Sequence, residues 1–494
     1  MKLIINGDIG RYYVQNLALI FFPGSKFSES ETVTDETPVL TLNVQKSEEG
    51  VGSFASVQIG EQYSESSDFE KYKKNIDAER TKKISVGKAV FSACQKMFGY
   101  TPSWGILTGI RPSKISRALL DAGNDEAQVR RILRNEYFLN PKKAALLTGI
   151  SSRETEIIKQ IGERTCSLYI SIPFCPTRCA YCSFVSFATK RLLSMIPEYL
   201  ERLLRDIDRA FEIVKENGLT ITTVYIGGGT PTTLNEKQLA SLLSKISEKL
   251  DMSKVREYSI EAGRPDTITP EKLEIIKQNG ITRISINPQT LNDAVLEGIG
   301  RHHTVEDFYR AFGMVKNSGI EHINTDLIAG LPGDTYRSFY KTVDSILKLA
   351  PDNITVHTFS VKKAADIVHA GFELYQPNAG DAQKSVDYSQ LKLGNAGYLP
   401  YYIYRQRNTV GNLENVGFAL PGCEGLYNMY IMEELHHIIA LGAGAVTKLV
   451  DTKAPSIERI FMPKYPYEYL SEENESFFNN EFPEKIARFI DNMK

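Results

Sequence analysis

Six short apolar segments rich in β-branched and aromatic residues alternate with helical patterns between residues 166 and 362. The six segments are Leu168–Ile172, Thr223–Ile226, Tyr258–Ile260, Arg283–Ile286, Ile323–Ile328 and Ile354–Phe359. Strands that alternate with helices form βαβ units, which build a parallel sheet. Six units are too few to close an eight-stranded barrel. The pattern therefore predicts an α/β fold, an open partial (β/α)6 TIM-like barrel whose active face lies at the C-terminal ends of the strands.

The length of 494 residues leaves room for further domains on both sides of this barrel. Residues 1–164 are predicted to form an N-terminal α+β accessory domain. Its expected strands are Leu3–Ile5, Leu17–Phe22, Val39–Val44 and Phe54–Ile59, and a helix with a buried stripe from Val86 to Phe98 follows them. The barrel is assigned to residues 165–362. Residues 363–494 form a C-terminal extension, which we expect to cover the substrate.

Composition excludes several classes of protein. The 58 Lys and Arg residues nearly balance the 60 Asp and Glu residues, so the net charge of -2 predicts neither a nucleic acid nor an anionic membrane as partner. No apolar run is long enough to span a membrane, and the N-terminal apolar stretch is too short for a signal peptide. We therefore expect a cytoplasmic protein whose six cysteines stay reduced unless they serve in chemistry.

Three of these cysteines, Cys175, Cys179 and Cys182, have the spacing C-x3-C-x2-C directly after the first predicted barrel strand. Three thiolates at this spacing can converge on one metal centre. A four-iron cluster normally has four Cys ligands, so three would leave one iron open to bind a substrate or cofactor. A structural zinc site is the alternative, but it needs a fourth Cys or His at a matching spacing. Cys166 lies nine residues upstream, across a strand, and the next histidines are distant.

A glycine-rich turn, Gly227–Thr232, follows the second predicted strand. Its three glycines expose backbone groups and allow a ligand to approach closely. No Gly-Lys-Ser/Thr sequence follows, so the turn is not a P-loop. A tight turn with no ligand is the alternative interpretation.

Polar residues stand at the ends of the remaining predicted strands. Glu261 ends the third strand and Gln289 follows the fourth. Asp326 lies on the fifth, and His357–Ser360 end the sixth. Polar groups that converge from different strands are typical of a ligand pocket, although a local turn or cap role fits any one of them equally well. Arg301, after Gly300, is a candidate clamp for an anionic ligand, with a solvated loop as the alternative.

Five motifs in the same order resemble a known family. They are Leu168–Cys175 (LYISIPFC), Gly227–Thr232 (GGGTPT), Arg283–Gln289 (RISINPQ), Gly300–His303 (GRHH) and Thr325–Gly333 (TDLIAGLPG). Together with the cysteine spacing, they resemble the radical S-adenosylmethionine (SAM) superfamily and, within it, the oxygen-independent coproporphyrinogen III oxidases and their relatives. Residues 1–160 look similar to the N-terminal extension of the HemZ-type coproporphyrinogen dehydrogenases.

Two positions depart from the better-known relatives. The oxidases carry a fourth Cys two positions after the third, where this sequence has Phe184. The haem chaperones of the same family carry a C-terminal His-Asn element, and the matching pair here is Tyr427-Asn428. The haem-binding chaperone therefore stays open as an alternative, and so does a radical SAM methyltransferase or ring-opening enzyme that acts on a porphyrin.

The resemblance implies a set of site residues. Cys175, Cys179 and Cys182 would hold a [4Fe-4S] cluster. The residues that would line SAM at the open iron are Tyr169, Gly228, Glu261 and Val446. Those that match a second SAM-sized pocket are Tyr181, Gly229, Thr230, Gln289, Arg301, Asp326 and Ser360. Glu261, Arg301 and Asp326 are the expected catalytic residues. Cys94, Cys166 and Cys423 are not expected to bind the cluster.

The implied reaction is the oxidative decarboxylation of coproporphyrinogen III to protoporphyrinogen IX without oxygen, with SAM and the cluster as cofactors, in porphyrin and haem biosynthesis. Carboxylates around an apolar macrocycle require cationic clamps and aromatic walls. Arg405, Arg407 and the Tyr401–Tyr404 run are candidates, with packing as the alternative for the aromatic run. The expected partners are the porphyrinogen and an electron donor such as flavodoxin or ferredoxin, and the chain is expected to be a monomer.

Overall fold

The computed structural model describes residues 1–27, 36–73, 77–162, 164–360, 379–406, 409–454 and 456–493. The contacts divide the chain into two compact units. The first is Met1–Thr155 with Ile403–Asn408, and the second is Glu156–Tyr402 with Thr409–Lys494. The three-domain division made from the sequence stays a prediction.

The first unit contains a four-stranded sheet in the order β1-β2-β3-β4. The strands β1 and β2 are parallel, and the other pairs are antiparallel. A helix, α2, packs on the sheet through a stripe of small and apolar residues that ends at Gly99, in the left-handed conformation typical of a helix C-cap. The elements are β1 (Lys2–Asn6), α1 (Arg11–Phe21), β2 (Val39–Lys46), β3 (Gly50–Ile59), β4 (Gln62–Lys71), α2 (Ala78–Phe98), α3 (Ser113–Asp121), α4 (Glu126–Tyr137) and α5 (Pro141–Ile158).

One predicted strand of this unit is wrong. Residues Leu17–Phe22, read as a strand from their continuous apolar character, fall almost entirely in the helix α1. The buried side chains of α1 are Val14, Leu17 and Ala18, at helical spacing. A short apolar run fits a buried helix as well as a strand, and the polar residues before Leu17 complete the helical pattern.

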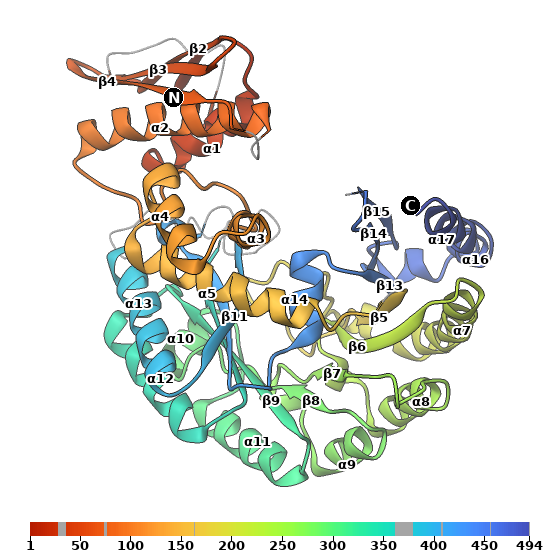
Figure 1. Cartoon of the computed structure of the whole chain (residues 1–494). Coiled ribbons are helices and arrows are strands. Elements are labelled where there is room, and N and C mark those ends of the chain that lie inside the picture. The colour runs from red at the N-terminus through yellow and green to blue at the C-terminus, as the bar shows by residue number, and fades with distance from the viewer. Residues whose placement is uncertain are drawn as a thin grey trace. The chain divides into compact units, whose positions relative to one another are not determined.

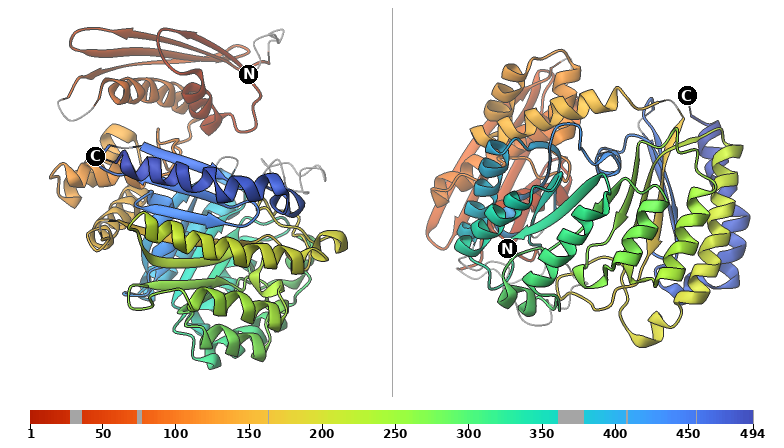
Figure 2. Two further views of the ribbon diagram at one scale, coloured as in Figure 1. Left: turned by 90° about the vertical axis from the view of Figure 1, so that its right-hand side faces the viewer. Right: turned by 90° about the horizontal axis from the view of Figure 1, so that it is seen from below.

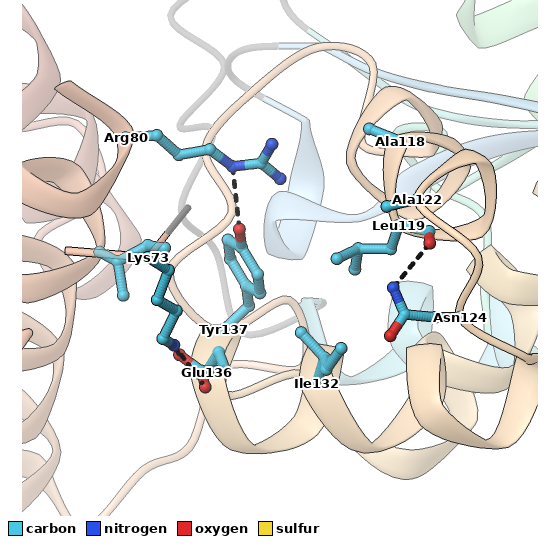
Figure 3. Close-up of a pocket in the computed structure, with 10 residues that line it drawn as sticks. Lys73, Arg80, Ala118, Leu119, Ala122, Asn124, Ile132, Glu136 and Tyr137 are labelled. Atoms are coloured by element: carbon cyan, nitrogen blue, oxygen red, sulfur yellow. Dashed lines mark hydrogen bonds and ion pairs between the residues drawn. The ribbon is translucent and has the colours of Figure 1, made fainter. Parts of the chain in front are cut away.

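A cavity of about 260 Å³ lies within the first unit, near α2, α3 and α4 (Figure 3). Tyr137 accepts a hydrogen bond from Nε of Arg80 at its edge (3.0 Å), and Lys73 pairs with Glu136 (3.0 Å). The residues that line it are Lys73, Arg80, Ile84, Ala118, Leu119, Ala122, Asn124, Ile132, Glu136 and Tyr137.

The second unit is built on an eleven-stranded sheet in the order β11-β12-β10-β9-β8-β7-β6-β5-β13-β14-β15. Its central strands, β5 to β10, neighbour one another in chain order, and all pair in parallel. Figures 1 and 2 show α7, α8, α9, α11 and α12 along the outer side of this curved sheet. The predicted partial barrel is confirmed.

The strand positions follow from burial on both faces, which is typical of parallel strands covered by helices. In β5, seven of the eight positions are buried. The barrel elements are β5 (Thr165–Ile172), α6 (Lys190–Leu193), α7 (Ile196–Glu216), β6 (Thr220–Gly228), α8 (Glu236–Ser247), β7 (Glu257–Glu261), α9 (Pro270–Gln278), β8 (Arg283–Ser285), α10 (Asp293–Gly298), α11 (Val305–Ser318), β9 (His322–Ala329), α12 (Tyr336–Leu349) and β10 (Asn353–Thr358).

The C-terminal part of the chain extends the barrel sheet at both edges. The strand β12 pairs antiparallel with β10, and β13 pairs parallel with β5. Its elements are α13 (Ala379–Asn395), β11 (Leu399–Arg405), β12 (Glu414–Ala419), α14 (Leu426–Glu433), β13 (His437–Leu441), β14 (Val446–Asp451), β15 (Ser456–Phe461), α15 (Pro466–Tyr469), α16 (Glu472–Asn479) and α17 (Glu481–Asp491). Residues 361–378 lie outside the described residues, and the substrate-covering role of this region stays a prediction.

A buried polar cluster joins the acidic, aromatic C-terminal tail to α7. Nε of Arg202 donates to Asp206 (2.7 Å), and the hydroxyl of Tyr469 donates to the other oxygen of the same carboxylate. The guanidinium of Arg202 also lies 5.5 Å from the centre of the Tyr469 ring. Burial raises the pKa of Asp206, and the hydrogen bonds from Arg202 and Tyr469 oppose this shift.

We predict that this cluster holds the C-terminal helices on the barrel. Asp206→Ala leaves the buried charge of Arg202 with the exposed Glu475 (3.4 Å) as its remaining acidic partner among the described residues, and is expected to lower the free energy of unfolding by about 3–5 kcal/mol. Tyr469→Phe removes one hydrogen bond to a buried carboxylate and should cost about 1–3 kcal/mol. Urea unfolding measures both. The exposed Tyr467 gives the matched control, since Tyr467→Phe should change little; equal effects at 467 and 469 would contradict the prediction.

Candidate active site

The three clustered cysteines lie on the loop between β5 and α6, at the C-terminal edge of the parallel strands. The backbone N–H of Cys175 donates to the carbonyl of Phe187, and that of Cys182 donates to the carbonyl of Cys179 (both 3.0 Å). The loop thus folds back, so that its beginning at Cys175 is hydrogen-bonded to its end at Phe187. This places three thiols on a short, folded segment beside the barrel interior.

Each thiol has a polar neighbour. Sγ of Cys175 lies 3.3 Å from the hydroxyl of Thr230, and Sγ of Cys182 lies 3.8 Å from that of Ser186. Nη1 of Arg264 lies 3.7 Å from Sγ of Cys179. Burial raises the pKa of Cys175 to about 11 and also raises the pKa of Cys182. A bound cation would therefore favour the deprotonated form of Cys175 and Cys182.

The donor set fits an iron–sulfur cluster. Among the residues that the structure describes, these three sulfur atoms do not all lie within 4.8 Å of one another. Ligands of a multi-iron cluster are spread around it, because each binds a different iron, whereas a single zinc ion draws its ligands together.

The glycine-rich turn at the end of β6 holds the cysteine loop. The N–H of Gly229 donates to the carbonyl of Ile172, and that of Thr230 donates to the carbonyl of Phe174 (both 2.8 Å). A Cβ on Gly229 would lie 2.6 Å from that Phe174 oxygen. Gly228, with a φ of +105°, likewise has no room for a Cβ beside Ser171. A side chain at 229 would thus collide with the backbone before Cys175, so this glycine serves close backbone packing.

Two carboxyl groups have opposite pKa shifts: Glu261 ends β7, and Asp326 lies within β9, with β8 between these two strands. Burial, together with the charge of Asp326, raises the pKa of Glu261 to about 7. Burial alone would also raise the pKa of Asp326, but hydrogen bonding and the charge of His357 (3.6 Å) outweigh it, so this pKa is lowered. Asp326 is thus the ionised member of the pair, and Glu261 titrates close to neutral pH.

Hydrogen bonds orient Glu261 from three directions. Oε1 accepts from the hydroxyl of Tyr225 and from that of Ser285 (2.9 Å), and Oε2 accepts from the side chain of Asn287 (3.4 Å). Glu261 as a whole is partly exposed, and these hydrogen bonds hold its carboxyl group in one orientation. Groups with a strongly shifted pKa in such a setting are typical of functional sites.

Three tyrosines, the buried Tyr427 and the half-buried Tyr169 and Tyr225, stack beneath this carboxyl group. The Tyr225 ring lies 4.3 Å from that of Tyr427 and 6.2 Å from that of Tyr169 (ring centres), and the planes differ by no more than 21°. Tyr169 comes from β5, Tyr225 from β6 and Tyr427 from α14. The stack fills the barrel interior with aromatic surface on the N-terminal side of Glu261.

Arg301 ties the cysteine loop to the strand ends. Nη2 donates to the carbonyls of Gly263 (2.6 Å) and Asn287 (2.7 Å), and Nη1 donates to the hydroxyl of Tyr181 (3.2 Å). Tyr181 is in the cysteine loop, between the second and third thiols. Nε of Arg301 is buried and has no hydrogen-bond partner. The role of Arg301 as a clamp for an anionic ligand stays a prediction, and Nε is the donor atom that could bind such a ligand.

Gln289 has the backbone strain of a functional position. Its φ is +68°, although it is not a glycine, and the Asp326 carbonyl and the Ile328 N–H bind its backbone (3.1 and 2.9 Å). Its side-chain Oε1 is buried without a hydrogen-bond partner. A strained residue with an unsatisfied buried oxygen fits contact with a polar ligand.

The structure brings together most, but not all, of the predicted site. Hydrogen bonds join five predicted residues into one network through Asn287, which follows β8: Tyr181, Arg301, Glu261, Asp326 and Gln289. Two further predicted residues lie at other strand ends: Ser360 forms a β-bridge with Thr409, and Val446 begins β14.

The proposed substrate clamp around residue 405 is a packing feature. The guanidinium of Arg405 lies 5.1 Å from the centre of the Trp104 ring and donates to the carbonyl of Leu107, within the first unit. Tyr401 and Tyr402 are buried. Arg407 lies outside the described residues.

Sequence analysis missed three contributors. Tyr225 and Asn287 hold Glu261, and Arg264 faces Cys179. Asn287 and Arg264 follow strands β8 and β7, so the rule that polar residues after barrel strands line a site could have found them. Tyr225 lies inside a strand in an apolar run and gave no such signal.

Comparisons with known proteins agree with this geometry. The model of the radical SAM superfamily matches residues 169–346. The chain is 37% identical over 390 residues to the "Oxygen-independent coproporphyrinogen-III oxidase-like protein HemZ" of Bacillus subtilis, and the match covers 78% of each chain. It is also 36% identical over 197 residues to the "Heme chaperone HemW" of the same organism, covering 40% of this chain and 51% of that one.

A solved structure shows the same fold. It is that of coproporphyrinogen III oxidase (HemN) from Escherichia coli, described as a radical SAM enzyme, with a TM-score of 0.52 and 21% identity over 66% of this chain and 72% of that one. The chain therefore belongs to the radical SAM superfamily and, within it, to the family of oxygen-independent coproporphyrinogen III oxidases and their relatives, of which the HemZ-type proteins are part.

Proposed function

We propose that this protein is an oxygen-independent coproporphyrinogen III oxidase, which decarboxylates two propionate side chains oxidatively to give protoporphyrinogen IX in porphyrin and haem biosynthesis. The observation that carries the proposal is the joining of the cysteine loop, through Tyr181 and Arg301, to the Glu261–Asp326 carboxyl pair at one edge of the barrel. The similarity to the HemZ protein over 78% of both chains supports the choice of reaction.

A [4Fe-4S] cluster and SAM are the cofactors of the superfamily, and when bound they supply the one-electron chemistry that removes a hydrogen atom from an unreactive carbon. We propose that Cys175, Cys179 and Cys182 hold the cluster. Thr230 and Arg264 donate toward the first two of these sulfurs and so stabilise them as thiolates.

The carboxyl pair is suited to a cationic ligand. Glu261 is poised to lose its proton near neutral pH, and a positive group beside it would favour that loss. SAM carries such groups. We therefore propose that Glu261 binds SAM, with Tyr169, Gly228 and Val446 around it. The charge of Asp326 would make the electrostatic potential near Glu261 more negative.

A second group of predicted residues lies near Glu261, on the segments that follow the neighbouring strands. Gln289 and Arg301 each present one buried atom that has no hydrogen-bond partner, an acceptor and a donor respectively. We propose that these atoms bind a second SAM or the substrate, together with Tyr181, Thr230, Asp326 and Ser360, while Gly229 keeps its structural role in the turn. The stacked tyrosines lie on the N-terminal side of Glu261 and would exclude water from that side of the site.

The expected partners complete the proposal. The reaction needs an electron donor of the flavodoxin or ferredoxin class, and we propose that one chain acts alone in the cytoplasm. None of the helices in the described residues is long and apolar enough to cross a membrane.

One observation favours a second candidate function, that of a haem chaperone. Several relatives bear the name "Heme chaperone HemW", at 36% identity in Bacillus subtilis and at 31% in Lactococcus lactis. The position of the chaperones' histidine is here Tyr427, which is buried in the tyrosine stack. A buried phenol in that place disfavours an exposed haem ligand, so the oxidase is the preferred function.

The first prediction from the proposed function distinguishes the oxidase from the haem chaperone. The chain, reconstituted anaerobically with iron and sulfide, is incubated with SAM, a reductant and coproporphyrinogen III, and the products are analysed. The oxidase should give a monovinyl intermediate before the divinyl product, with SAM cleavage that depends on the porphyrinogen. Tight haem binding and transfer to an acceptor, without a vinyl product, would instead establish the chaperone; a methylated or ring-opened product would contradict both.

The second prediction concerns the cluster ligands. Cys175→Ala, Cys179→Ala and Cys182→Ala should each lose the iron and the visible absorbance of the cluster, because no fourth thiol replaces the missing ligand. Cys94→Ala and Cys166→Ala are the controls, since both thiols are buried away from the loop and burial raises the pKa of each to about 12. Retention of full iron by Cys179→Ala would contradict the assignment.

The third prediction follows from the pKa of Glu261. A protonated carboxyl group attracts a cation less, so the affinity for SAM should fall as the pH drops below about 7. Glu261→Gln should bind SAM more weakly, by about 1.5–3 kcal/mol, at neutral pH and should lose the pH dependence. Tyr225→Phe removes a hydrogen bond that lowers this pKa and should move the midpoint to higher pH.

Calorimetry at several pH values measures these affinities, with iron content as the control for an intact cluster. A pH profile of Glu261→Gln that matches that of the unaltered protein would show that another group binds the cation.

A further inference from the structure

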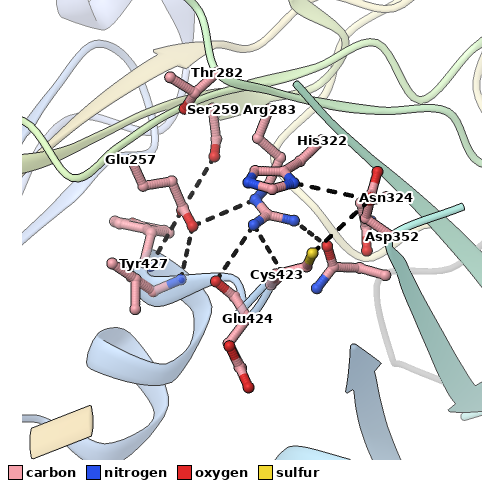
Figure 4. Close-up of polar contacts among 12 residues, drawn as sticks. Glu257, Ser259, Thr282, Arg283, His322, Asn324, Asp352, Cys423, Glu424 and Tyr427 are labelled. Atoms are coloured by element: carbon pink, nitrogen blue, oxygen red, sulfur yellow. Dashed lines mark hydrogen bonds and ion pairs between the residues drawn. The ribbon is translucent and has the colours of Figure 1, made fainter. Parts of the chain in front are cut away.

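A second group of metal-ligating side chains lies at the opposite end of the barrel. His322 begins β9, Asp352 directly precedes β10, and Cys423 follows β12 (Figure 4). The strands β9 and β10 are parallel to β5, and β12 runs antiparallel to β10. All three residues therefore gather at the N-terminal ends of the barrel strands, whereas Cys175, Cys179 and Cys182 follow the C-terminal end of β5.

The ligand atoms of these residues converge on one point. Oδ1 of Asp352 lies 3.9 Å from Nδ1 of His322 and 3.8 Å from Sγ of Cys423, and all three atoms lie within 4.8 Å of one another. The second carboxylate oxygen, Oδ2, accepts the N–H of Ile323 (2.8 Å). This hydrogen bond fixes the carboxylate with Oδ1 toward the imidazole and the thiol.

One of these three ligand atoms makes no hydrogen bond within the described part of the chain. Nδ1 of His322 is buried and has no hydrogen-bond partner among the residues that the structure describes, since 3.9 Å to the carboxylate is too long for a hydrogen bond. Buried polar atoms without a partner are rare, and an ion absent from the coordinates is one recognised reason. The atom faces an oxygen and a sulfur, which are both possible metal ligands.

We propose that His322, Asp352 and Cys423 bind one divalent transition-metal ion of the zinc class, with solvent as the fourth ligand. Zinc accepts imidazole, carboxylate and thiolate together, at bond lengths of about 2.0–2.3 Å in a tetrahedral arrangement. Such an arrangement separates the ligand atoms by roughly 3.3–3.6 Å. The two separations from Oδ1 of Asp352 need to shrink by only a few tenths of an ångström, and the third pair, His322 and Cys423, lies within 4.8 Å and has to close by no more than roughly 1.5 Å.

Charge also favours a divalent cation here. An ionised Asp352 and a Cys423 thiolate would together balance its two positive charges, and Glu321 adds a carboxylate 3.6 Å from Nε2 of the His322 ring. The nearby guanidinium of Arg283 is paired with the carboxylate of Glu257 (3.3 Å). Its positive charge is thus largely neutralised before it can oppose the ion.

The role of this ion would be structural. Figure 4 shows that the loop with Cys423 leads into α14. Arg283 binds the carbonyls of Cys423 and Glu424 (2.9 and 3.3 Å), and Glu257 accepts the N–H groups of Leu426 and Tyr427 (2.7 and 3.2 Å). The ion would add a further link between this loop and the ends of β9 and β10, and so hold Tyr427 in the tyrosine stack.

The experiment uses the full-length chain with Cys175, Cys179 and Cys182 changed to Ser, so that no metal binds in the cluster loop. After treatment with a chelator, the protein is titrated with Zn²⁺ against a competing chelator and, separately, with Co²⁺. We expect about one equivalent of either ion to bind, with the absorption of a thiolate–cobalt bond in a tetrahedral site.

Two further changes identify the ligands. Adding Cys423→Ser should weaken binding on the order of 10–100-fold or more and abolish the thiolate–cobalt absorption. Adding His322→Gln should weaken binding similarly but keep that absorption, because the sulfur remains. Adding Cys166→Ala, a buried thiol in β5, is the matched control and should change neither.

Absence of stoichiometric binding, or binding in the Cys423→Ser protein equal to that of the Cys166→Ala control, would overturn the proposal. Circular dichroism establishes that each variant is folded, and the His322→Gln protein keeps the test decisive if Cys423→Ser does not fold. The result does not depend on the cluster or on the porphyrinogen reaction, so it stands or falls apart from the proposed function.

Discussion

The parallel pairing of β5 to β10 is the constraint on which the rest of the structure depends. Because these strands neighbour one another in chain order, all their C-terminal ends lie along one edge. The register sets Ile172 beside Gly228, and Glu261 beside Ser285. This alignment brings the cysteine loop, the glycine turn and the carboxyl pair to one place. Each is contributed by a different βα connection or strand end, so none could form a site alone.

Two kinds of contact turn this edge into a chemical site. Backbone hydrogen bonds from Gly229 and Thr230 fix the segment before Cys175, and Arg301 fixes Tyr181 to the carbonyls after β7 and β8. Burial and the charge of Asp326 raise the pKa of Glu261, whereas hydrogen bonding and the charge of His357 outweigh burial at Asp326 and lower its pKa. The low polarity that makes Glu261 titrate near neutral pH also strengthens its interaction with any cation that enters. The C-terminal edge of the strands thus holds both the backbone that fixes the cysteine loop and the carboxyl groups with shifted pKa values.

Much of this could be predicted from the sequence. The alternation of apolar segments predicted all six barrel strands, and the cysteine spacing and the motifs predicted the family. Periodicity failed at Leu17–Phe22, where an apolar run fits a helix as well as a strand. It also could not show that β12 and β13 join opposite edges of the same sheet, because such pairings join residues far apart in the chain. The pairing of Tyr225 with Glu261 and the convergence of His322, Asp352 and Cys423 depend on the fold alone, since nothing in their spacing relates them.

The central claim is that three cysteines at this edge hold a cluster with one iron open to SAM. Electron paramagnetic resonance of the reduced, reconstituted protein, recorded before and after addition of SAM, tests it most directly. The account predicts a signal of a [4Fe-4S] cluster whose shape changes when SAM is added, and a smaller change at equal SAM concentration in the Glu261→Gln protein. A signal that SAM leaves unchanged in the unaltered protein would mean that no iron is open to it, and would contradict the account.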